Sequence, residues 1–221
     1  MSRILTWVSD NKDSIIAITA LFVSIVTTIA VWKQAKIDKT LSQLQIAREQ
    51  PFFKVCTRLE QDTDDGTYGT EHLVVKNKGF QNITPKVSRT VLFEMSRNRN
   101  GDKDSILVKV ADYFNYTETD NADDEIIYHS LGRGNNRVFH KLYMEALADK
   151  GEDGVYYWFD KIILVKIDYT DLLKEKHSVY FINKVVVDKD EYQKMLSRVY
   201  KEDYYLSSLD YQKIKALLPA D

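Results

Sequence analysis

The chain has 221 residues, with 31 Lys and Arg against 33 Asp and Glu, and a formal net charge of −2. Hydrophobic residues make up 44% and charged residues 29%, which is typical of a folded domain and excludes a disordered tail. The small negative charge excludes bulk electrostatic attraction to nucleic acid, so any anion site must be a local cluster. The single cysteine, Cys56, excludes an intramolecular disulfide.

The N-terminal region contains an uninterrupted run, Ser14–Trp32, without a charge, a proline or a glycine. As a helix this run measures about 28 Å, close to the hydrocarbon thickness of a bilayer. Its length, the absence of a small-x-small cleavage site before Trp32 and the helical pattern beyond it favour a retained anchor over a cleaved signal peptide. We therefore predict a short segment at 1–13 and a transmembrane helix at 14–32.

The orientation of this helix follows from the charges at its two ends. Basic residues are more frequent after the run than before it, with Lys33, Lys36, Lys39 and Arg48 on one side and Arg3 and Lys12 on the other. The positive-inside rule then places the C-terminal domain in the cytoplasm. The prediction is a single-pass protein of the cell inner membrane, with membrane lipid as its first partner.

Small and polar residues recur every three or four positions along the same helix, so they share one face. This seam consists of Asp13, Ala17, Ala20, Ser24, Thr27, Val31 and Asp38. Bulky residues such as Ile18, Phe22 and Ile25 cover the other side. A helix alone in lipid gains nothing from such a seam, whereas a helix packed against copies of itself does. The pattern therefore predicts a homo-oligomer.

The seam fits two different assemblies. In the first, Ser24 and Thr27 line a water-filled pore, and Asp13 and Asp38 form rings at its mouths that favour cations. In the second, the bundle is dry, and the hydroxyl groups bond to carbonyls of their own helix.

Beyond the predicted membrane span, the periodicity changes twice. A helical pattern continues through 33–50 as a stalk that ends at Pro51, either in a parallel bundle or lying against the following domain. From Pro51 an alternating pattern with frequent turns predicts about seven strands over 51–187, an antiparallel, immunoglobulin-like β-sandwich. Asp188 with Glu191 forms a capping box, which predicts C-terminal helices over 188–221, the second starting near Ser208.

The sequence contains no recognisable catalytic motif, so we predict that the protein is not an enzyme and needs no cofactor. The four histidines, His72, His129, His140 and His177, lack the spacing of metal ligands, so no metal site is predicted. Cys56 lies in an alternating strand and is expected to be a buried thiol.

One short segment, 132–137, carries more specific chemistry. Its two glycines permit close backbone approach, and Arg133 and Arg137 could bind a phosphate group, helped by His140 and Lys141. The alternative is a hairpin turn that uses glycine and asparagine for positive φ angles; this explains those residues but not both arginines.

In architecture, the anchor at Ser14–Trp32, the stalk and the β region after Pro51 resemble the membrane effectors of nucleotide-signalled bacterial antiviral systems, of the CBASS, type III CRISPR and Hailong kinds. The resemblance implies an oligomer that binds a nucleotide or oligonucleotide messenger in its soluble part and opens or disrupts the membrane. The function expected is a pore-forming effector gated by its cytosolic β domain. The alternative is a membrane-tethered adaptor without channel activity.

Overall fold

A computed structural model describes residues 7, 11–48, 50–61, 66–79, 84–99, 101–118, 125–149, 154–171 and 174–219. The chain divides into two compact units, Met1–Gln50 and Pro51–Asp221. The first is helical and the second is mostly β, with helices in its C-terminal part. Each unit is described on its own.

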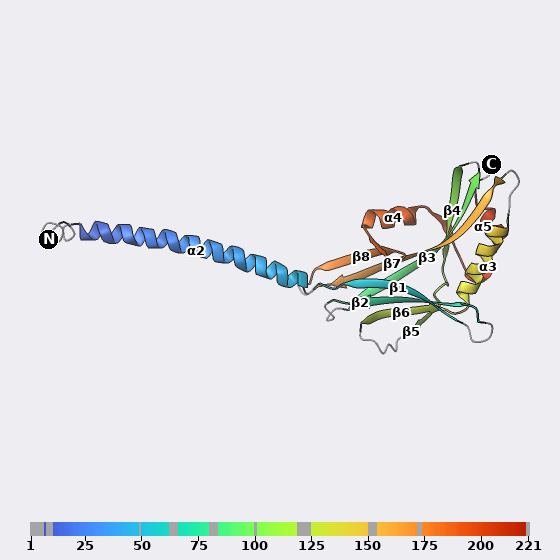
Figure 1. Cartoon of the computed structure of the whole chain (residues 1–221), viewed down its shortest axis with the longest axis horizontal. Coiled ribbons are helices and arrows are strands. Elements are labelled where there is room, and N and C mark those ends of the chain that lie inside the picture. The colour runs from blue at the N-terminus through green and yellow to red at the C-terminus, as the bar shows by residue number, and fades with distance from the viewer. Residues whose placement is uncertain are drawn as a thin grey trace. The chain divides into compact units, whose positions relative to one another are not determined.

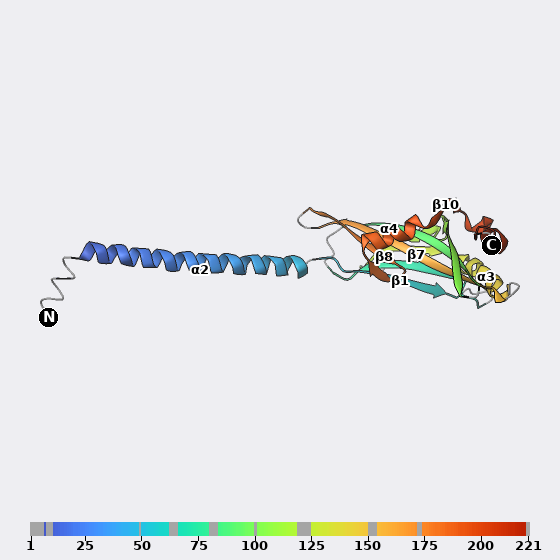
Figure 2. The ribbon, with the colours of Figure 1, turned by 90° about the horizontal axis from the view of Figure 1, so that it is seen from above.

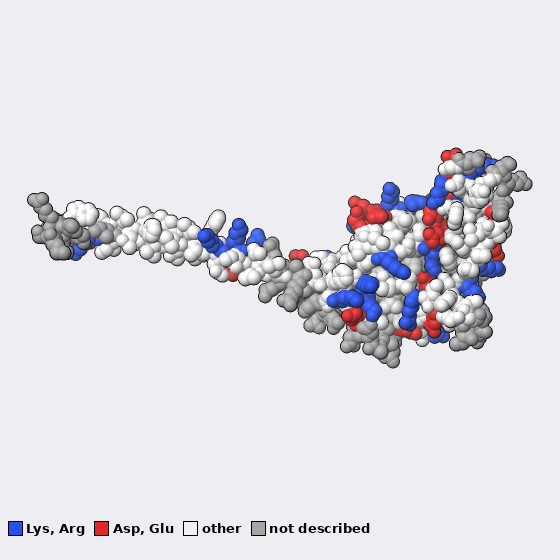
Figure 3. Space-filling model, viewed as in Figure 1, with Lys and Arg blue, Asp and Glu red and all other residues white. Residues whose placement is uncertain are grey.

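The first unit is dominated by one long helix, α2, Lys12–Arg48, which has 37 residues (Figure 1). No proline or glycine interrupts it, and Asp13 in its first turn suits the positive end of the helix dipole. Within the described part of the chain, α2 is the one helix long and apolar enough to cross a membrane, judged by length and composition. Its apolar stretch is followed by a group of exposed basic side chains, Lys33, Lys36 and Lys39 (Figure 3).

The second unit contains two sheets. The smaller has the order β1-β2-β6-β5, and all its neighbouring strands are antiparallel. Its strands are β1 (Phe53–Glu60), β2 (Thr70–Asn77), β6 (Ile126–Gly132) and β5 (Tyr116–Glu118).

The larger sheet has the order β10-β4-β3-β7-β8-β9. Its strands are β10 (Val199–Tyr204), β4 (Asp102–Val110), β3 (Lys86–Arg99), β7 (Tyr156–Thr170), β8 (Lys176–Ile182) and β9 (Val185–Val187). The long central pair β3 and β7 is in register from Lys86↔Asp168 to Asn98↔Tyr156. The edge strand β10 departs from the expected antiparallel pattern, because it runs parallel to β4.

The main hydrophobic core takes side chains from both sheets. Alternate residues point into it, as the period of two predicts, for example Val55 of β1, Val75 of β2, Phe93 of β3 and Val165 of β7. Helix α3 (Asn135–Ala148) adds Leu142 and Ala146, and helix α5 (Tyr211–Lys215) adds Tyr211 and Ile214. The two sheets and these helices therefore form one folded body.

A second, smaller core lies on the opposite face of the large sheet. Helix α4 (Lys189–Ser197) places Tyr192 against Leu92, Leu107 and Leu164 and lies over β8 (Figure 2). The predicted capping box is present in part: the side chain of Asp188 accepts a hydrogen bond from the backbone N–H of Glu191 at 2.8 Å. An N-cap of this kind stabilises a helix by about 1 kcal/mol.

Three features differ from the sequence-based expectation. The described residues hold ten strands instead of about seven, and β10 interrupts the predicted C-terminal helical region. Residues 135–148, within the region predicted to consist of strands, form the helix α3. The second C-terminal helix consists of a 3₁₀ turn, Leu206–Ser208, followed by α5, which is capped by Asp210. The immunoglobulin-like arrangement stays a prediction.

Candidate functional site

The seam residues of the first unit all lie on α2 and are exposed. These residues are Asp13, Ala17, Ala20, Ser24, Thr27, Val31 and Asp38. They occur at intervals of three or four residues as far as Val31, and Asp38 follows seven residues later, so on one continuous helix they follow one face. Large apolar side chains are also exposed, including Ile18, Phe22 and Ile25. A helix with this surface has the length and composition of a membrane span.

Two hydroxyl groups of the apolar stretch bond within their own helix. Thr27 Oγ1 donates to the carbonyl of Val23 at 2.7 Å, and Thr28 Oγ1 donates to the carbonyl of Ser24 at 2.8 Å. Such back-bonding satisfies the hydroxyl in an apolar environment. This contact is the one expected of a dry bundle, although a hydroxyl bonded in this way still presents its oxygen to the helix surface.

The predicted phosphate segment of the second unit is a strand-to-helix junction. Strand β6 ends at Gly132, and α3 begins at Asn135 after Gly134, whose φ is +71°. A Cβ at Gly132 would overlap the carbonyl oxygen of Tyr113, so this position requires glycine. The segment is therefore not a hairpin turn, because it joins a strand to a helix. The explanation of glycine by a positive φ angle is correct at Gly134.

Both asparagines of the junction have structural roles. Asn135 Nδ2 donates to the carbonyl of Tyr113 at 2.5 Å, and Asn136 Nδ2 donates to the carbonyl of Tyr68 at 2.6 Å. The backbone N–H of Asn136 donates to the carbonyl of Gly69 at 3.0 Å. A neighbouring carbonyl thus uses one of the helix N-terminal donors that a phosphate group would need.

The four predicted ligand-binding residues remain exposed around this junction. Arg133 lies beside Tyr116, with Cζ 4.7 Å from the ring centroid. Arg137 donates to Thr67 Oγ1 at 3.3 Å, and Lys141 Nζ lies 3.9 Å from Glu145 Oε1. Because Arg137, His140 and Lys141 are three or four residues apart on α3, they share one exposed helix face. These side chains form a basic surface rather than a closed pocket.

Below this surface, the core contains a buried polar cluster that the sequence pattern did not indicate. Lys161 of β7 makes an ion pair with Glu71 of β2 and bonds to Tyr113 Oη at 2.7 Å. Its Nζ also lies 3.4 Å from Oδ1 of Asn136, at the start of α3. Burial lowers the pKa of Lys161, and Glu71 opposes that shift. Burial also raises the pKa of Tyr113, so its hydroxyl stays protonated and donates to Glu71 at 2.6 Å.

A second buried cluster brings together two histidines on the face of the small sheet opposite the main core. His72 Nδ1 of β2 lies 2.9 Å from His129 Nε2 of β6. The other ring nitrogens contact carboxylates from the flanking strands: His72 Nε2 lies 2.5 Å from Glu60 Oε2, and His129 Nδ1 lies 2.8 Å from Glu118 Oε2. The imidazoles are 5% and 7% exposed, so water screens them little.

The environment of the pair affects its protonation. Burial lowers the pKa of His129; Glu118 opposes that shift, while His72 and Arg58 reinforce it. The sequence did not reveal the pair, because 57 residues separate the two histidines. The alternation along β2 does place one of the two histidines. Leu73 and Val75 point into the core, so His72 lies on the other face of its strand.

A third group lies at the β7–β8 hairpin. Within the described residues, Asp171, Glu175 and His177 are the three side chains whose potential ligand atoms all lie within 4.8 Å of one another. Asp171 already has local roles, because it accepts the backbone N–H of Glu175 at 2.8 Å and contacts His177 Nε2 at 2.8 Å. These bonds stabilise the β7–β8 hairpin, and they explain why the three side chains lie close together.

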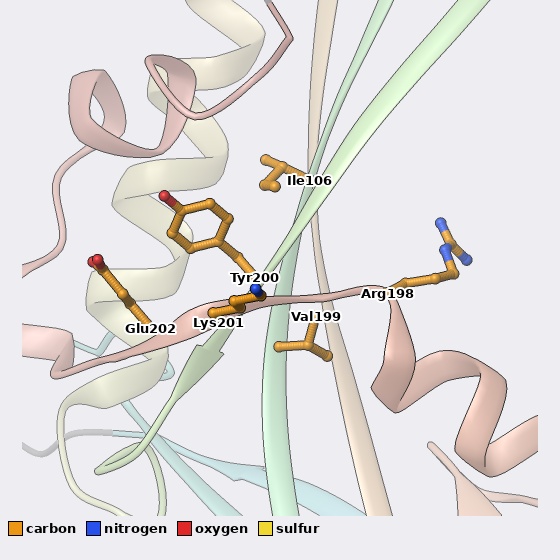
Figure 4. A pocket seen from close by; sticks show the side chains of 6 residues that line it. All are labelled: Ile106, Arg198, Val199, Tyr200, Lys201 and Glu202. Carbon is orange, nitrogen blue, oxygen red and sulfur yellow. The ribbon is translucent and has the colours of Figure 1, made fainter.

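A cleft of about 420 Å³ follows strand β10 beside β4 (Figure 4). Arg198 points away from Tyr200 and Glu202, so the polar groups do not converge on one point. Arg198 is instead directed to Ser105 Oγ at 3.3 Å and Glu94 Oε1 at 3.7 Å. The cleft therefore lacks the convergent polar groups that are typical of a ligand-binding site.

Taken together, the structure offers a membrane-type helix with a seam, an exposed basic surface at the start of α3 and a buried histidine pair. Comparison with protein-family models, with curated proteins and with solved structures finds no match for this chain.

Proposed function

We propose that the protein is a single-pass inner-membrane effector that self-associates through the seam of α2, with its β unit in the cytoplasm. Binding of an anionic messenger to the β unit controls an assembly that conducts ions or disrupts the membrane. A nucleotide or oligonucleotide is the messenger class that fits the basic surface, and antiviral defence is the setting that the architectural resemblance implies. The proposal includes no catalytic step.

The seam of α2 carries the proposal. All described side chains from Lys12 to Leu44 are exposed, so the described residues of the first unit do not cover the apolar face of this helix themselves. Lipid can cover Phe22 and Ile25, but small residues such as Ala20 create a groove that another helix fills better than lipid does. Assembly of several copies would then bring Ser24 and Thr27 to a common axis.

The link between the basic surface and the core supports a ligand-sensing role for the β unit. Arg133 and Arg137 flank the first turn of α3, and Asn136 of that turn contacts the buried Lys161. A phosphate group held by the two arginines would pull on the turn that this contact anchors. Binding of a ligand at the surface of the β unit would thus change contacts in its core.

Thiol labelling tests the pore. In a Cys56→Ser background, which removes the native thiol, single cysteines replace Ser24 or Thr27, and Phe22 or Ile25 serves as the control position on the opposite face. A small charged thiol reagent should react at the seam and not at the control positions, because thiolates form only where water reaches. Planar-bilayer recordings of the same variants should show conductance that falls after labelling at Ser24.

A second candidate, a membrane-tethered adaptor with a dry helix bundle, is favoured by the back-bonded hydroxyls of Thr27 and Thr28. It predicts crosslinked oligomers without conductance and without labelling on either face. This combination would reject the pore and retain the assembly.

A further inference from the structure

The central strand β7 extends beyond its neighbour β8, so part of one of its edges has no partner strand. On one side β7 pairs with β3 as far as Tyr156, its first residue, whereas on the other side the pairing with β8 stops at Leu164. Within the described part of the chain, no strand covers this second side of β7 between Tyr156 and Ile163. A strand edge with open backbone groups is a template for pairing with another strand.

The contacts of Ile163 show which backbone groups point to the open side. Its N–H donates to Oδ1 of Asn183 at 2.8 Å, and its carbonyl accepts the N–H of Asn183 at 2.6 Å, so both groups point away from β3. The direction of these groups alternates along a strand. The N–H and C=O groups of Tyr157, Phe159 and Lys161 therefore also point to the open side.

Asp160 limits the length of the open stretch. The backbone N–H of Lys161 donates to Oδ1 of Asp160 at 2.7 Å, so it needs no acceptor from another strand. The residues of this stretch that offer both a donor and an acceptor are therefore Tyr157 and Phe159. Their side chains are buried in the main core, where Phe159 packs against Phe139 of α3, so a partner strand would meet their backbone groups.

Two large aromatic side chains lie beside these backbone groups on the other face of the sheet. Tyr156 is 60% exposed and Trp158 is 55% exposed. Both alternate with the core residues of β7, so they share their face with Asp160. Exposed aromatic side chains are enriched at protein interfaces, and proteins usually cover or charge an open strand edge. This edge therefore has the character of an interface.

We propose that the edge pairs with the same edge of a second copy of the chain, as two antiparallel β7 strands related by a two-fold axis at Trp158. Tyr157 of each copy then exchanges both of its backbone hydrogen bonds with Phe159 of the other. Because both copies use the same stretch, the pairing closes as a dimer and does not propagate. The inference concerns the β unit and does not depend on the membrane function proposed above.

The edge is complementary to itself in this register. Trp158 lies opposite Trp158 of the second copy in a non-hydrogen-bonded pair, where side chains approach most closely and aromatic pairs are favourable. Tyr156 lies opposite Asp160 of the second copy, so no like charges meet. An axis at Phe159 would instead require the N–H of Lys161, which Asp160 already accepts, and would place Trp158 opposite Asp160. The contacts of Asp160 therefore favour the axis at Trp158.

Disulfide crosslinking of the full-length protein in detergent tests this pairing. The background carries Cys56→Ser, which removes the native thiol, and Ala20→Leu with Ser24→Leu, which removes the seam as a route to association. Across the proposed axis, residue 158 lies about 4.5 Å from its counterpart, Cα to Cα, a distance that a disulfide spans. The Trp158→Cys protein should therefore form a covalent dimer under mild oxidation.

Two matched variants separate this register from chance collision. Tyr156→Cys and Asp160→Cys each lie two residues from the axis, so each thiol is about 14 Å from its own counterpart and should not crosslink alone. A mixture of the two proteins should crosslink, because residue 156 of one copy lies opposite residue 160 of the other. Adding Trp158→Lys to both should abolish crosslinking of the mixture, since like charges would lie opposite each other, whereas Trp158→Phe should preserve it. Absence of crosslinking in the mixture, or equal crosslinking of Tyr156→Cys alone, would overturn the proposal.

Discussion

Lys161 shows how a single residue departs from the pattern of its strand. It has the same parity as Phe159, Ile163 and Val165, all of which point into the main core. The alternation therefore predicts an apolar side chain at this position, and the sequence contains no sign that Glu71, 90 residues away, would be its partner. A buried ion pair of this kind costs desolvation energy that its attraction need not offset, so its presence is weak evidence for a gain in stability.

The pair makes a prediction about stability. Lys161→Met should destabilise the full-length protein by about 3–5 kcal/mol, because Glu71 would stay buried without its counter-charge. Adding Glu71→Gln should recover most of that loss, since the double variant buries no unpaired charge. Urea unfolding in detergent, followed by tyrosine and tryptophan fluorescence, measures both values. Equal or greater destabilisation in the double variant would show that the charges are not coupled.

At the scale of elements, the success of sequence reasoning depended on periodicity. The long run with helical period is one helix, and alternation at Phe53, Val55 and Val75 correctly marks strands whose side chains face the core. Residues 199–204 lie in the region 188–221, for which the sequence predicts C-terminal helices. Their strand state follows from pairing with β4, which no local pattern contains.

The seam of α2 makes a prediction about assembly. Replacing Ala20 and Ser24 together by Leu should reduce crosslinked oligomers in membranes, because bulky side chains prevent close approach of two backbones. Phe22→Leu, on the other face of the same helix, is the matched control and should leave crosslinking unchanged. If the seam variant and the control crosslink equally, the seam is not the interface.

The basic surface at the start of α3 makes a prediction about ligand binding. Arg133→Ala with Arg137→Ala should abolish binding of an anionic nucleotide, since each lost charge-assisted hydrogen bond is worth about 1.5–3 kcal/mol. Both side chains are exposed, so the unfolding temperature should change little. Titration with a panel of cyclic and linear nucleotides measures the effect, and Lys201→Ala on β10 is a control outside this surface. Unchanged binding in the folded double variant would return the junction to a purely structural role.

For the whole molecule, the division at Gln50 and Pro51 separates two kinds of stabilisation. The second unit contains a core shared by two sheets, and its folding is accounted for by its own contacts. The described residues of the first unit have exposed apolar side chains, which the proposed function assigns to lipid and to other copies of the helix. The sequence predicts this division, because the spacing of its apolar residues changes from helical to alternating at Pro51.

The orientation of the molecule is testable with reporters at Asp221. A fluorescent protein that matures only in the cytoplasm should be bright when fused there, because Lys33, Lys36 and Lys39 follow the span. A periplasmic phosphatase fused at the same position should be inactive. The reverse result would place the β unit outside the cell and remove the basis for a cytosolic messenger.

The parallel pairing of β10 with β4 has a consequence for the order of events during synthesis. Strand β4 is complete at Val110, but its outer partner starts only at Val199, near the end of the chain. The ribosome delivers about 5–20 residues per second, so β4 must wait several seconds with an open edge. During that interval the open edge of β4 could pair with a strand of a neighbouring nascent chain. Protection of this edge by a chaperone would therefore be useful until β10 has emerged from the ribosome.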